Sequence, residues 1–344
     1  MAAGIQKIRW RAGRLAQLAL ACALVAGGWG ASGAAAAAGL STAVVPAAGG
    51  ARSLELMLWS PCAAPPSTLS IGPYQVQARR DCPRPAGPLP LVLISHGQGG
   101  TRLGHHDTAT ALADAGYLVA SFNHPGDSYG DDAGASEPAI FASRPADVSR
   151  AITYLVEQWP ERERVDAGAI GVFGFSRGGY TALALAGGVP DRAASAERHC
   201  GSWRALLLTV CRRLGRSDAQ LTARPDPRVR AIVAADPLNL FGPASFRGVG
   251  IPVQLWASAL GGDGVSLADV QAIQRALPAP PAFQVVAGAG HFAFLAPCTD
   301  AFREEARRLC EDPPGFDHVR WHATLNAAVV AFFDRNLRRP APAR

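Results

Sequence analysis

The stretch that decides the fold of this chain is Ala169-Ile170-Gly171-Val172-Phe173-Gly174-Phe175-Ser176-Arg177-Gly178-Gly179-Tyr180. It is an apolar run followed by Gly-x-Ser-x-Gly-Gly, and a helix-forming run continues it over residues 181–186. Such a sequence predicts a strand that turns sharply into a helix, with the serine in a strained conformation and its hydroxyl above the sheet. Gly174 and Gly178 suit this turn because strand and helix pass too close there for side chains. Ser176 is therefore a candidate nucleophile, and the competing interpretation is a glycine-rich structural turn.

Apolar segments and helix-forming segments alternate on both sides of this stretch. Further strands are expected at 89–94, 117–122, 229–235, 252–257 and 283–287, and helices at 103–115, 145–158, 265–277 and 316–337. Short apolar strands separated by helices are typical of a parallel sheet covered on both faces. We therefore predict an α/β fold with a mostly parallel central sheet.

One large domain is expected over residues 53–338, which begins with two early strands at 54–59 and 74–80. The Ala/Gly/Pro-rich residues 37–52 are predicted to be a flexible lead-in. Residues from about 190 to 227 break the alternation, and we interpret them as a small helical cap inserted over the site.

The composition favours a globular protein and gives no reason to expect nucleic-acid binding. The 344 residues are 49% hydrophobic, which is ample for one large core. The net charge of +6 depends on four basic residues among the first 36, where no acidic residue occurs. The rest of the chain has 29 basic and 27 acidic residues, so a basic surface for nucleic acid is not indicated.

The first 36 residues have the pattern of a secretory signal peptide. A basic region ends at Arg14, a short apolar run follows over 15–25, and the small-residue run 34–38 offers cleavage sites. The apolar run is too short to span a bilayer comfortably. We expect an exported protein, periplasmic or secreted, with no stable membrane insertion after cleavage; an uncleaved N-terminal anchor is the alternative.

Six cysteines remain after the signal, and an even number in an exported chain indicates disulfides. They form three sequence-local pairs, so we predict Cys62–Cys82, Cys200–Cys211 and Cys298–Cys310. No Cys-x-x-Cys pair or Cys/His cluster supports a metal site, and none is predicted.

A serine hydroxyl needs a neighbouring base before it becomes a good nucleophile. The best candidate is His291, because Gly288-Ala289-Gly290-His291 follows a predicted strand and leaves the ring at the edge where strands end. The competing interpretation is a histidine on a surface loop.

The base in turn needs a carboxylate that orients it and stabilises its charged form. Two aspartates between Ser176 and His291 qualify: Asp263, in a glycine-rich turn after the strand 252–257, and Asp236, directly after the strand 229–235. Both keep the chain order serine, acid, histidine. We favour Asp263 and keep Asp236 as the alternative acid.

The oxyanion that forms during acyl transfer needs preorganised N–H donors. One is expected from the backbone N–H of Arg177, at the start of the helix after the nucleophile. The second is expected from the loop His96-Gly97-Gln98-Gly99-Gly100, where we select the backbone N–H of Gln98. The Arg177 side chain is expected to be structural.

These motifs together resemble the α/β-hydrolase superfamily, and within it the bacterial exported proteins described as predicted dienelactone hydrolases, related to platelet-activating-factor acetylhydrolases. The likeness covers roughly 89–335. It implies an α/β-hydrolase fold and serine esterase chemistry. The branch usually has its acid after the strand that here precedes Asp263, whereas the acetylhydrolase relatives have it one strand earlier, at Asp236. True dienelactone hydrolases use a cysteine nucleophile, so the resemblance transfers no substrate.

The sequence therefore predicts an exported carboxylic-ester hydrolase that acts on a small-molecule ester without a cofactor. Amide or peptide hydrolysis on the same fold and a non-catalytic binding protein are the alternative functions. The substrate is not indicated, because it depends on the insertion 190–227 and on loops near 124–142 and 292–315.

Overall fold

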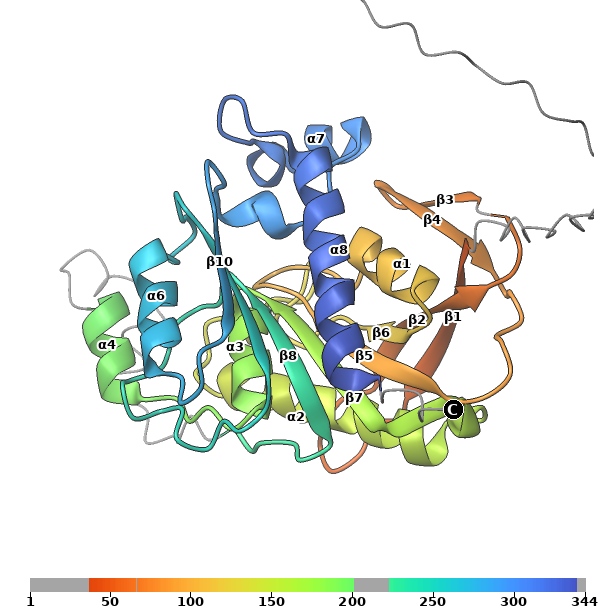
Figure 1. The fold of residues 1–344 in the computed structure, drawn as a ribbon, viewed down its shortest axis with the longest axis horizontal. Coiled ribbons are helices and arrows are strands. Elements are labelled where there is room, and N and C mark those ends of the chain that lie inside the picture. Colours follow the sequence, from red (N-terminus) through yellow and green to blue (C-terminus); the bar gives the residue numbers. More distant parts are fainter. Residues whose placement is uncertain (1–36, 66, 201–222, 339–344) are drawn as a thin grey trace, which may run out of the picture. The chain divides into compact units, whose positions relative to one another are not determined.

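A computed structural model describes residues 37–338 of the chain, apart from residues 66 and 201–222. Figure 1 shows a central sheet with helices packed against it. The strands are β1 (Ala37–Val45), β2 (Leu54–Cys62), β3 (Thr68–Ile71), β4 (Tyr74–Arg80), β5 (Leu89–Ser95), β6 (Leu118–Ser121), β7 (Val165–Phe175), β8 (Val229–Ala235), β9 (Val253–Ser258) and β10 (Ala282–Val286). The α-helices are α1 (His106–Asp114), α2 (Ile140–Thr153), α3 (Arg177–Leu185), α4 (Arg192–Cys200), α6 (Leu267–Ala276), α7 (Asp300–Glu305) and α8 (His318–Leu337).

The described strands form one ten-stranded sheet in the order β10-β9-β8-β7-β5-β6-β2-β1-β4-β3. From β10 to β6 every neighbouring pair is parallel, and β2 joins this half antiparallel to β6. The carboxyl ends of the parallel strands therefore meet at one edge, where an α/β sheet places its chemistry. The predicted mostly parallel sheet is confirmed.

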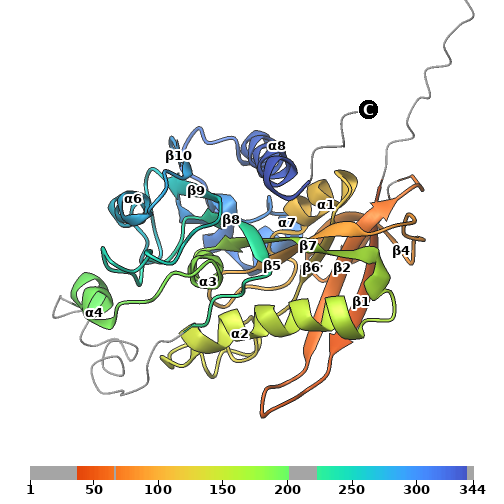
Figure 2. The same cartoon turned by 60° about the horizontal axis from the view of Figure 1, so that its bottom comes forward.

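Helices cover the sheet on both faces, as Figure 2 shows. The buried side chains form two clusters: one contains apolar residues of α2, α3 and α6, and the other contains those of α1 and α8. The strands β5 and β7 send alternate residues into both clusters, for example Val172 into the first and Phe173 into the second. This two-sided burial explains why these strands are almost uniformly apolar.

Two of the three predicted disulfides are confirmed. Cys62 pairs with Cys82, and Cys298 pairs with Cys310. For the third predicted pair, Cys200–Cys211, Cys211 lies outside the described residues, as does the whole predicted signal peptide. Among the helices that the structure describes, none combines the length and the apolar character of a membrane span.

The prediction that residues 37–52 form a flexible lead-in is wrong for its first half. Residues 37–45 are strand β1, which pairs antiparallel with β2 along its whole length, from Ala37 opposite Cys62 to Val45 opposite Leu54. Leu40 and Val45 are buried in this arrangement. At Gly39 a side chain would be crowded, because its Cβ would lie 3.1 Å from Cβ of Cys82.

The inserted segment begins with a helix, as expected. Helix α4 contacts two other segments. The Ser195 hydroxyl donates to the backbone oxygen of Leu240, between β8 and β9, at 2.9 Å. Arg198 forms an ion pair with Asp269 of α6. Residues 201–222 of the insertion are outside the described part, so a cap over the site stays a prediction.

Candidate active site

The predicted strand–turn–helix around Ser176 is present. Ser176 lies between the end of β7 and the start of α3, with φ 55° and ψ −116°, a conformation that costs energy for a residue with a side chain. Its backbone N–H donates to Ala235 at the end of β8 (2.9 Å), and its carbonyl accepts from Tyr180 in α3 (3.1 Å). These bonds fix the strained serine at the carboxyl edge of the sheet.

The glycines on either side allow this close crossing. A Cβ on Gly174 would lie 2.0 Å from the backbone oxygen of Gly178, and a Cβ on Gly178 would lie 1.9 Å from the backbone oxygen of Ser95 in β5. Any side chain at these positions would push the helix off the strand ends. The pattern Gly-x-Ser-x-Gly is thus required by the packing of the turn.

His291 and Asp236 form a buried pair beside this turn. Nδ1 of His291 lies 2.6 Å from Oδ2 of Asp236, and both side chains are almost completely buried. The His291 ring also packs 4.7 Å, centroid to centroid, from the ring of Phe175, the residue before the serine. The structure therefore brings the histidine, an aspartate and the serine turn to one place.

Asp236 is held by two further donors. The backbone N–H of Ser258 donates to Oδ1 at 2.9 Å, and the Ser258 hydroxyl donates to Oδ2 at 2.7 Å. A buried carboxylate must have such partners, because leaving it unpaired would cost several kcal/mol. Together with His291, these groups fix the orientation of the carboxylate.

The preference for Asp263 over Asp236 is not supported, because Asp263 is not the partner of His291. Its side chain is 40% exposed, and Oδ1 accepts from Nη2 of Arg308 at 2.7 Å. The reason lies in the order of the sheet: β8 is the direct neighbour of β7, and Asp236 is the first residue after it. Asp263 comes five residues after β9, which is one strand further from the serine.

The turn that contains Asp263 has a different relation to His291. The backbone N–H of His291 donates to the carbonyl of Gly261 at 2.9 Å, and a Cβ on Gly262 would lie 3.2 Å from Cβ of His291. The Gly-Gly pair thus supports the histidine loop through the backbone, whereas the Asp263 carboxylate faces outward to Arg308.

The two predicted oxyanion donors lie on segments that meet at the turn. A Cβ on Gly97, the residue before Gln98, would lie 3.3 Å from Cβ of Ser176. Neither the Gln98 nor the Arg177 backbone N–H has an acceptor among the residues that the structure describes. Their side chains are joined directly, since Nη2 of Arg177 donates to Oε1 of Gln98 at 2.6 Å.

A buried charge cluster holds these two segments together. Oδ2 of Asp127 accepts from Nη1 of Arg177 at 2.9 Å and from Nη1 of Arg144 at 2.7 Å. Its other oxygen accepts from the backbone N–H of Gly99 at 3.4 Å. Arg144 also donates to the backbone oxygen of His96. Asp127 is completely buried, so both the loop and the start of α3 are anchored to one carboxylate.

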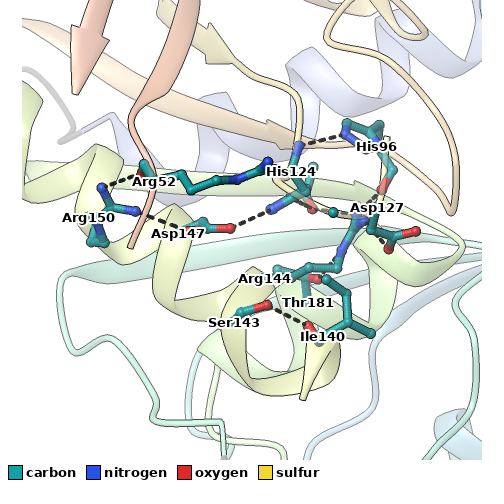
Figure 3. A network of polar contacts seen from close by, with 12 residues as sticks. Arg52, His96, His124, Asp127, Ile140, Ser143, Arg144, Asp147, Arg150 and Thr181 are labelled. Carbon is teal, nitrogen blue, oxygen red and sulfur yellow. Dashed lines mark hydrogen bonds and ion pairs between the residues drawn. The ribbon is translucent and has the colours of Figure 1, made fainter. Parts of the chain in front are cut away.

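Figure 3 shows Asp127 and Arg144 of this cluster together with two histidines, His96 and His124. Burial, reinforced by the charge of Arg144, holds the pKa of His96 and of His124 well below the usual value. Nε2 of His96 accepts from the backbone N–H of His124 at 3.1 Å, so its Nδ1 carries the proton and donates to the Gly97 carbonyl at 2.6 Å. His96 therefore shapes the loop that contains Gln98.

Asp127 and Arg144 were missed as site residues by sequence reasoning. Asp127 precedes Ser176 in the chain, so it does not fit the expected order of serine, acid and histidine. Chain order does not bear on whether a carboxylate anchors neighbouring segments. A usable signal exists: Asp127 follows the strand β6 at the same sheet edge as Gln98 and Ser176. No group of three or more possible metal ligands occurs among the described residues.

Comparisons with known proteins agree with this architecture. A family model described as alpha/beta hydrolase fold matches residues 90–208. Among solved structures, a ferulic acid esterase from Streptomyces cinnamoneus is similar with a TM-score of 0.57 and 20% identity, covering 91% of this chain and 93% of the other. A dienelactone hydrolase from Anabaena variabilis is similar with a TM-score of 0.50 and 16% identity, covering 88% of this chain and 99% of the other. A comparison with curated proteins finds no match.

The matched region contains β5 from Pro90 on, the loop with Gln98 and the turn at Ser176, whereas Asp236 and His291 lie outside it. At identities of 16–20% the two solved structures establish the fold alone. Sequence, sheet order and family model therefore agree on one architecture.

Proposed function

We propose that this chain, an α/β-hydrolase by fold and family model, is a serine hydrolase that cleaves carboxylic esters through an acyl-enzyme. The observation that carries the proposal is the buried Asp236–His291 pair beside a strained serine turn. A histidine whose Nδ1 is held by a carboxylate presents Nε2 as a base, which is the arrangement that activates a serine hydroxyl.

In the first half of the reaction, Oγ of Ser176 attacks the carbonyl carbon of the ester. The hydroxyl proton passes to Nε2 of His291, and Asp236 stabilises the resulting imidazolium. The carbonyl oxygen becomes an oxyanion, which accepts hydrogen bonds from the backbone N–H groups of Gln98 and Arg177. The bond to the alcohol oxygen then breaks, and His291 gives its proton to the leaving alcohol.

In the second half, water attacks the acyl-enzyme and His291 takes one of its protons. The second oxyanion forms in the same place, and its collapse releases the carboxylic acid while His291 returns the proton to Ser176. Apart from the attacking water, these steps use only the side chains of Ser176, His291 and Asp236 and the two backbone N–H donors.

Export belongs to the same proposal. The predicted signal peptide over residues 1–36 and the disulfides Cys62–Cys82 and Cys298–Cys310 support it, because structural disulfides persist in oxidising compartments. We expect mass spectrometry of the protein recovered from outside the cytoplasm to give an N-terminus within or just after residues 27–38. Recovery of the full-length chain would contradict cleavage.

The activity is tested with a short ester such as ethyl acetate. A pH-stat measures its hydrolysis through the protons that the product acid releases. Replacing Ser176 by Ala is expected to lower kcat by several powers of ten, because the nucleophile is lost. The control is Thr324→Val, which removes an exposed hydroxyl on α8 that donates to the Arg320 carbonyl at 3.2 Å, and it is expected to leave kcat unchanged within about twofold. Equal activity of wild type and Ser176→Ala would contradict the proposal.

A further inference from the structure

A partly open pocket adjoins the loop that contains Gln98. Its volume is about 210 Å³. Its walls come from the loop 99–104, from Pro73 and Tyr74 where β4 begins, and from the segment 295–309, and Tyr129 completes the lining. We call it the Tyr74 pocket. The reaction described above does not use it.

Two walls of the pocket are direct continuations of the proposed catalytic segments. Gly99 and Gly100 follow Gln98, the proposed oxyanion donor. Leu295 and Ala296 follow His291 by four and five residues, and the backbone N–H of Ala296 donates to the Gly104 carbonyl at 2.9 Å. Both proposed catalytic segments therefore continue directly into walls of this pocket, which is the reason to connect the pocket with the ester.

The lining is mostly apolar and aromatic, and Glu305 and Thr101 are its polar members. Tyr74 and Phe302 face each other with ring centroids 5.0 Å apart, and Leu295 and Leu309 add aliphatic surface. The Tyr74 hydroxyl lies 3.1 Å from the Thr101 hydroxyl, so its hydrogen bond is made within the wall and the ring remains for contact. Such a surface favours an apolar group, since each apolar Å² removed from water contributes about 25 cal/mol.

The walls are fixed before any ligand binds. The Cys298–Cys310 disulfide closes the segment that contributes Phe302 and Leu309. The Thr299 hydroxyl donates to the backbone oxygen of Pro73 at 2.6 Å, which ties this segment to the β3–β4 turn. A pocket with fixed walls selects by size, because binding cannot be recovered by rearranging the chain.

The volume limits what can bind. Pockets for whole drug-sized ligands measure roughly 300–1,000 Å³, and a cavity of about 150 Å³ accommodates benzene. The 210 Å³ of the Tyr74 pocket therefore suits one aromatic ring with a short substituent, or a branched chain of similar size.

We infer that the Tyr74 pocket is a specificity site that binds an apolar substituent of the ester, about the size of a phenyl ring. This inference rests on the proposed ester hydrolysis and adds to it the chemical class of the substrate: esters with one ring-sized apolar group. The group is on the acyl or on the alcohol side of the ester, and the test separates the two.

The test compares kcat/KM for three esters: ethyl acetate, ethyl phenylacetate with a ring on the acyl side, and benzyl acetate with a ring on the alcohol side. The wild type is expected to prefer one ring-bearing ester over ethyl acetate by about tenfold or more. Ala306→Trp fills the pocket and is expected to abolish that preference, with the rate on ethyl acetate unchanged within about twofold. Ala301→Trp, exposed on α7 and outside the lining, is the matched control and keeps the preference.

Leu309→Trp fills the pocket from a second position and replaces Ala306→Trp if that variant does not fold. A preference for ethyl phenylacetate that is lost in the filled variant assigns the pocket to the acyl group, and the same result with benzyl acetate assigns it to the alcohol. A wild type that hydrolyses ethyl acetate without preferring either ring, or a filled variant that keeps the preference, overturns the inference alone. A wild type that hydrolyses none of the three esters overturns the proposed ester hydrolysis and the pocket with it.

Discussion

Nδ1 of His291 lies 2.6 Å from Oδ2 of Asp236, and the two residues are 55 positions apart in the chain. The contact joins the first residue after β8 to the loop after β10, so it depends on the order of the strands in the sheet. The contact also distinguishes two aspartates that are equally placed candidates in the sequence: Asp236 pairs with His291, whereas Asp263 pairs with Arg308 at the surface.

The first prediction compares these aspartates. Asp236→Asn is expected to lower kcat by roughly four powers of ten, because the amide cannot stabilise the charged imidazole and favours the wrong tautomer. Asp263→Asn removes only an exposed ion pair and is expected to leave kcat within about threefold. Steady-state ester hydrolysis measures both, and a larger loss in Asp263→Asn would overturn the assignment.

The second prediction concerns the charge cluster at Asp127. Asp127→Asn leaves the buried guanidinium of Arg144 and that of Arg177 without their shared carboxylate. Breaking a buried pair in this way costs about 3–5 kcal/mol of folding free energy. Denaturant unfolding should show that loss, whereas the exposed control Asp263→Asn should lose less than about 1 kcal/mol. Equal stability of the two variants would argue that Asp127 is not an anchor.

The third prediction concerns acid sensitivity. Burial lowers the pKa of His105 to about 4 in the folded protein, against 6.5 for an ordinary histidine. The unfolded chain therefore takes up a proton first, so stability is lost as the pH falls from about 6.5 to about 4. The full effect is about 3 kcal/mol, at 1.36 kcal/mol for each pKa unit.

The variant His105→Asn isolates this effect. It keeps a polar group near the Phe294 carbonyl, which lies 3.0 Å from Nδ1 of His105, but it does not titrate. Burial raises the pKa of Asp147 from 3.8 to about 6. This carboxyl therefore increases the stability of the folded protein as the pH falls from about 6 to about 4, opposite to the effect of His105. The free energy of unfolding of wild type and of His105→Asn is therefore measured at pH 7.5 and at pH 4.5. The wild type is expected to lose more stability between these two pH values than the variant, and an equal loss in both proteins would contradict the prediction.

The fourth prediction concerns the Cys298–Cys310 disulfide, which closes a 12-residue separation. Replacing both cysteines by serine is expected to cost about 3 kcal/mol in the chain-entropy model. Denaturant unfolding of the double variant measures it. The single variant Cys298→Ser, which also lacks the disulfide, should show a similar loss; a stable single variant would mean that the disulfide contributes little.

The local features of the fold could be predicted from the sequence. The turn at Ser176 is encoded within a few residues, because only glycine fits at Gly174 and Gly178. The strands of the parallel half are also encoded locally, since burial on both faces makes them continuously apolar. Strand β1 could not be found in this way: its Ala/Gly-rich sequence is also typical of a flexible linker, and its partner β2 decides its conformation.

Relations that depend on the order of the strands, or on contacts between several separate segments, could not be predicted. Choosing Asp236 over Asp263 requires knowing that β8 is next to β7, and no local pattern contains this information. The cluster of Asp127 with Arg144 and Arg177 is likewise built from three separate segments. The Tyr74 pocket depends on the disulfide-closed segment packing against the β3–β4 turn.

The most direct test of the account is labelling with a fluorophosphonate, which reacts with a serine only when a neighbouring base activates it. Peptide mapping by mass spectrometry should locate the label on Ser176 in the wild type and find none in Ser176→Ala, with strongly reduced labelling in His291→Ala. An unlabelled wild type, or a label that persists in Ser176→Ala, would contradict the claim that this chain is a serine hydrolase acting through Ser176.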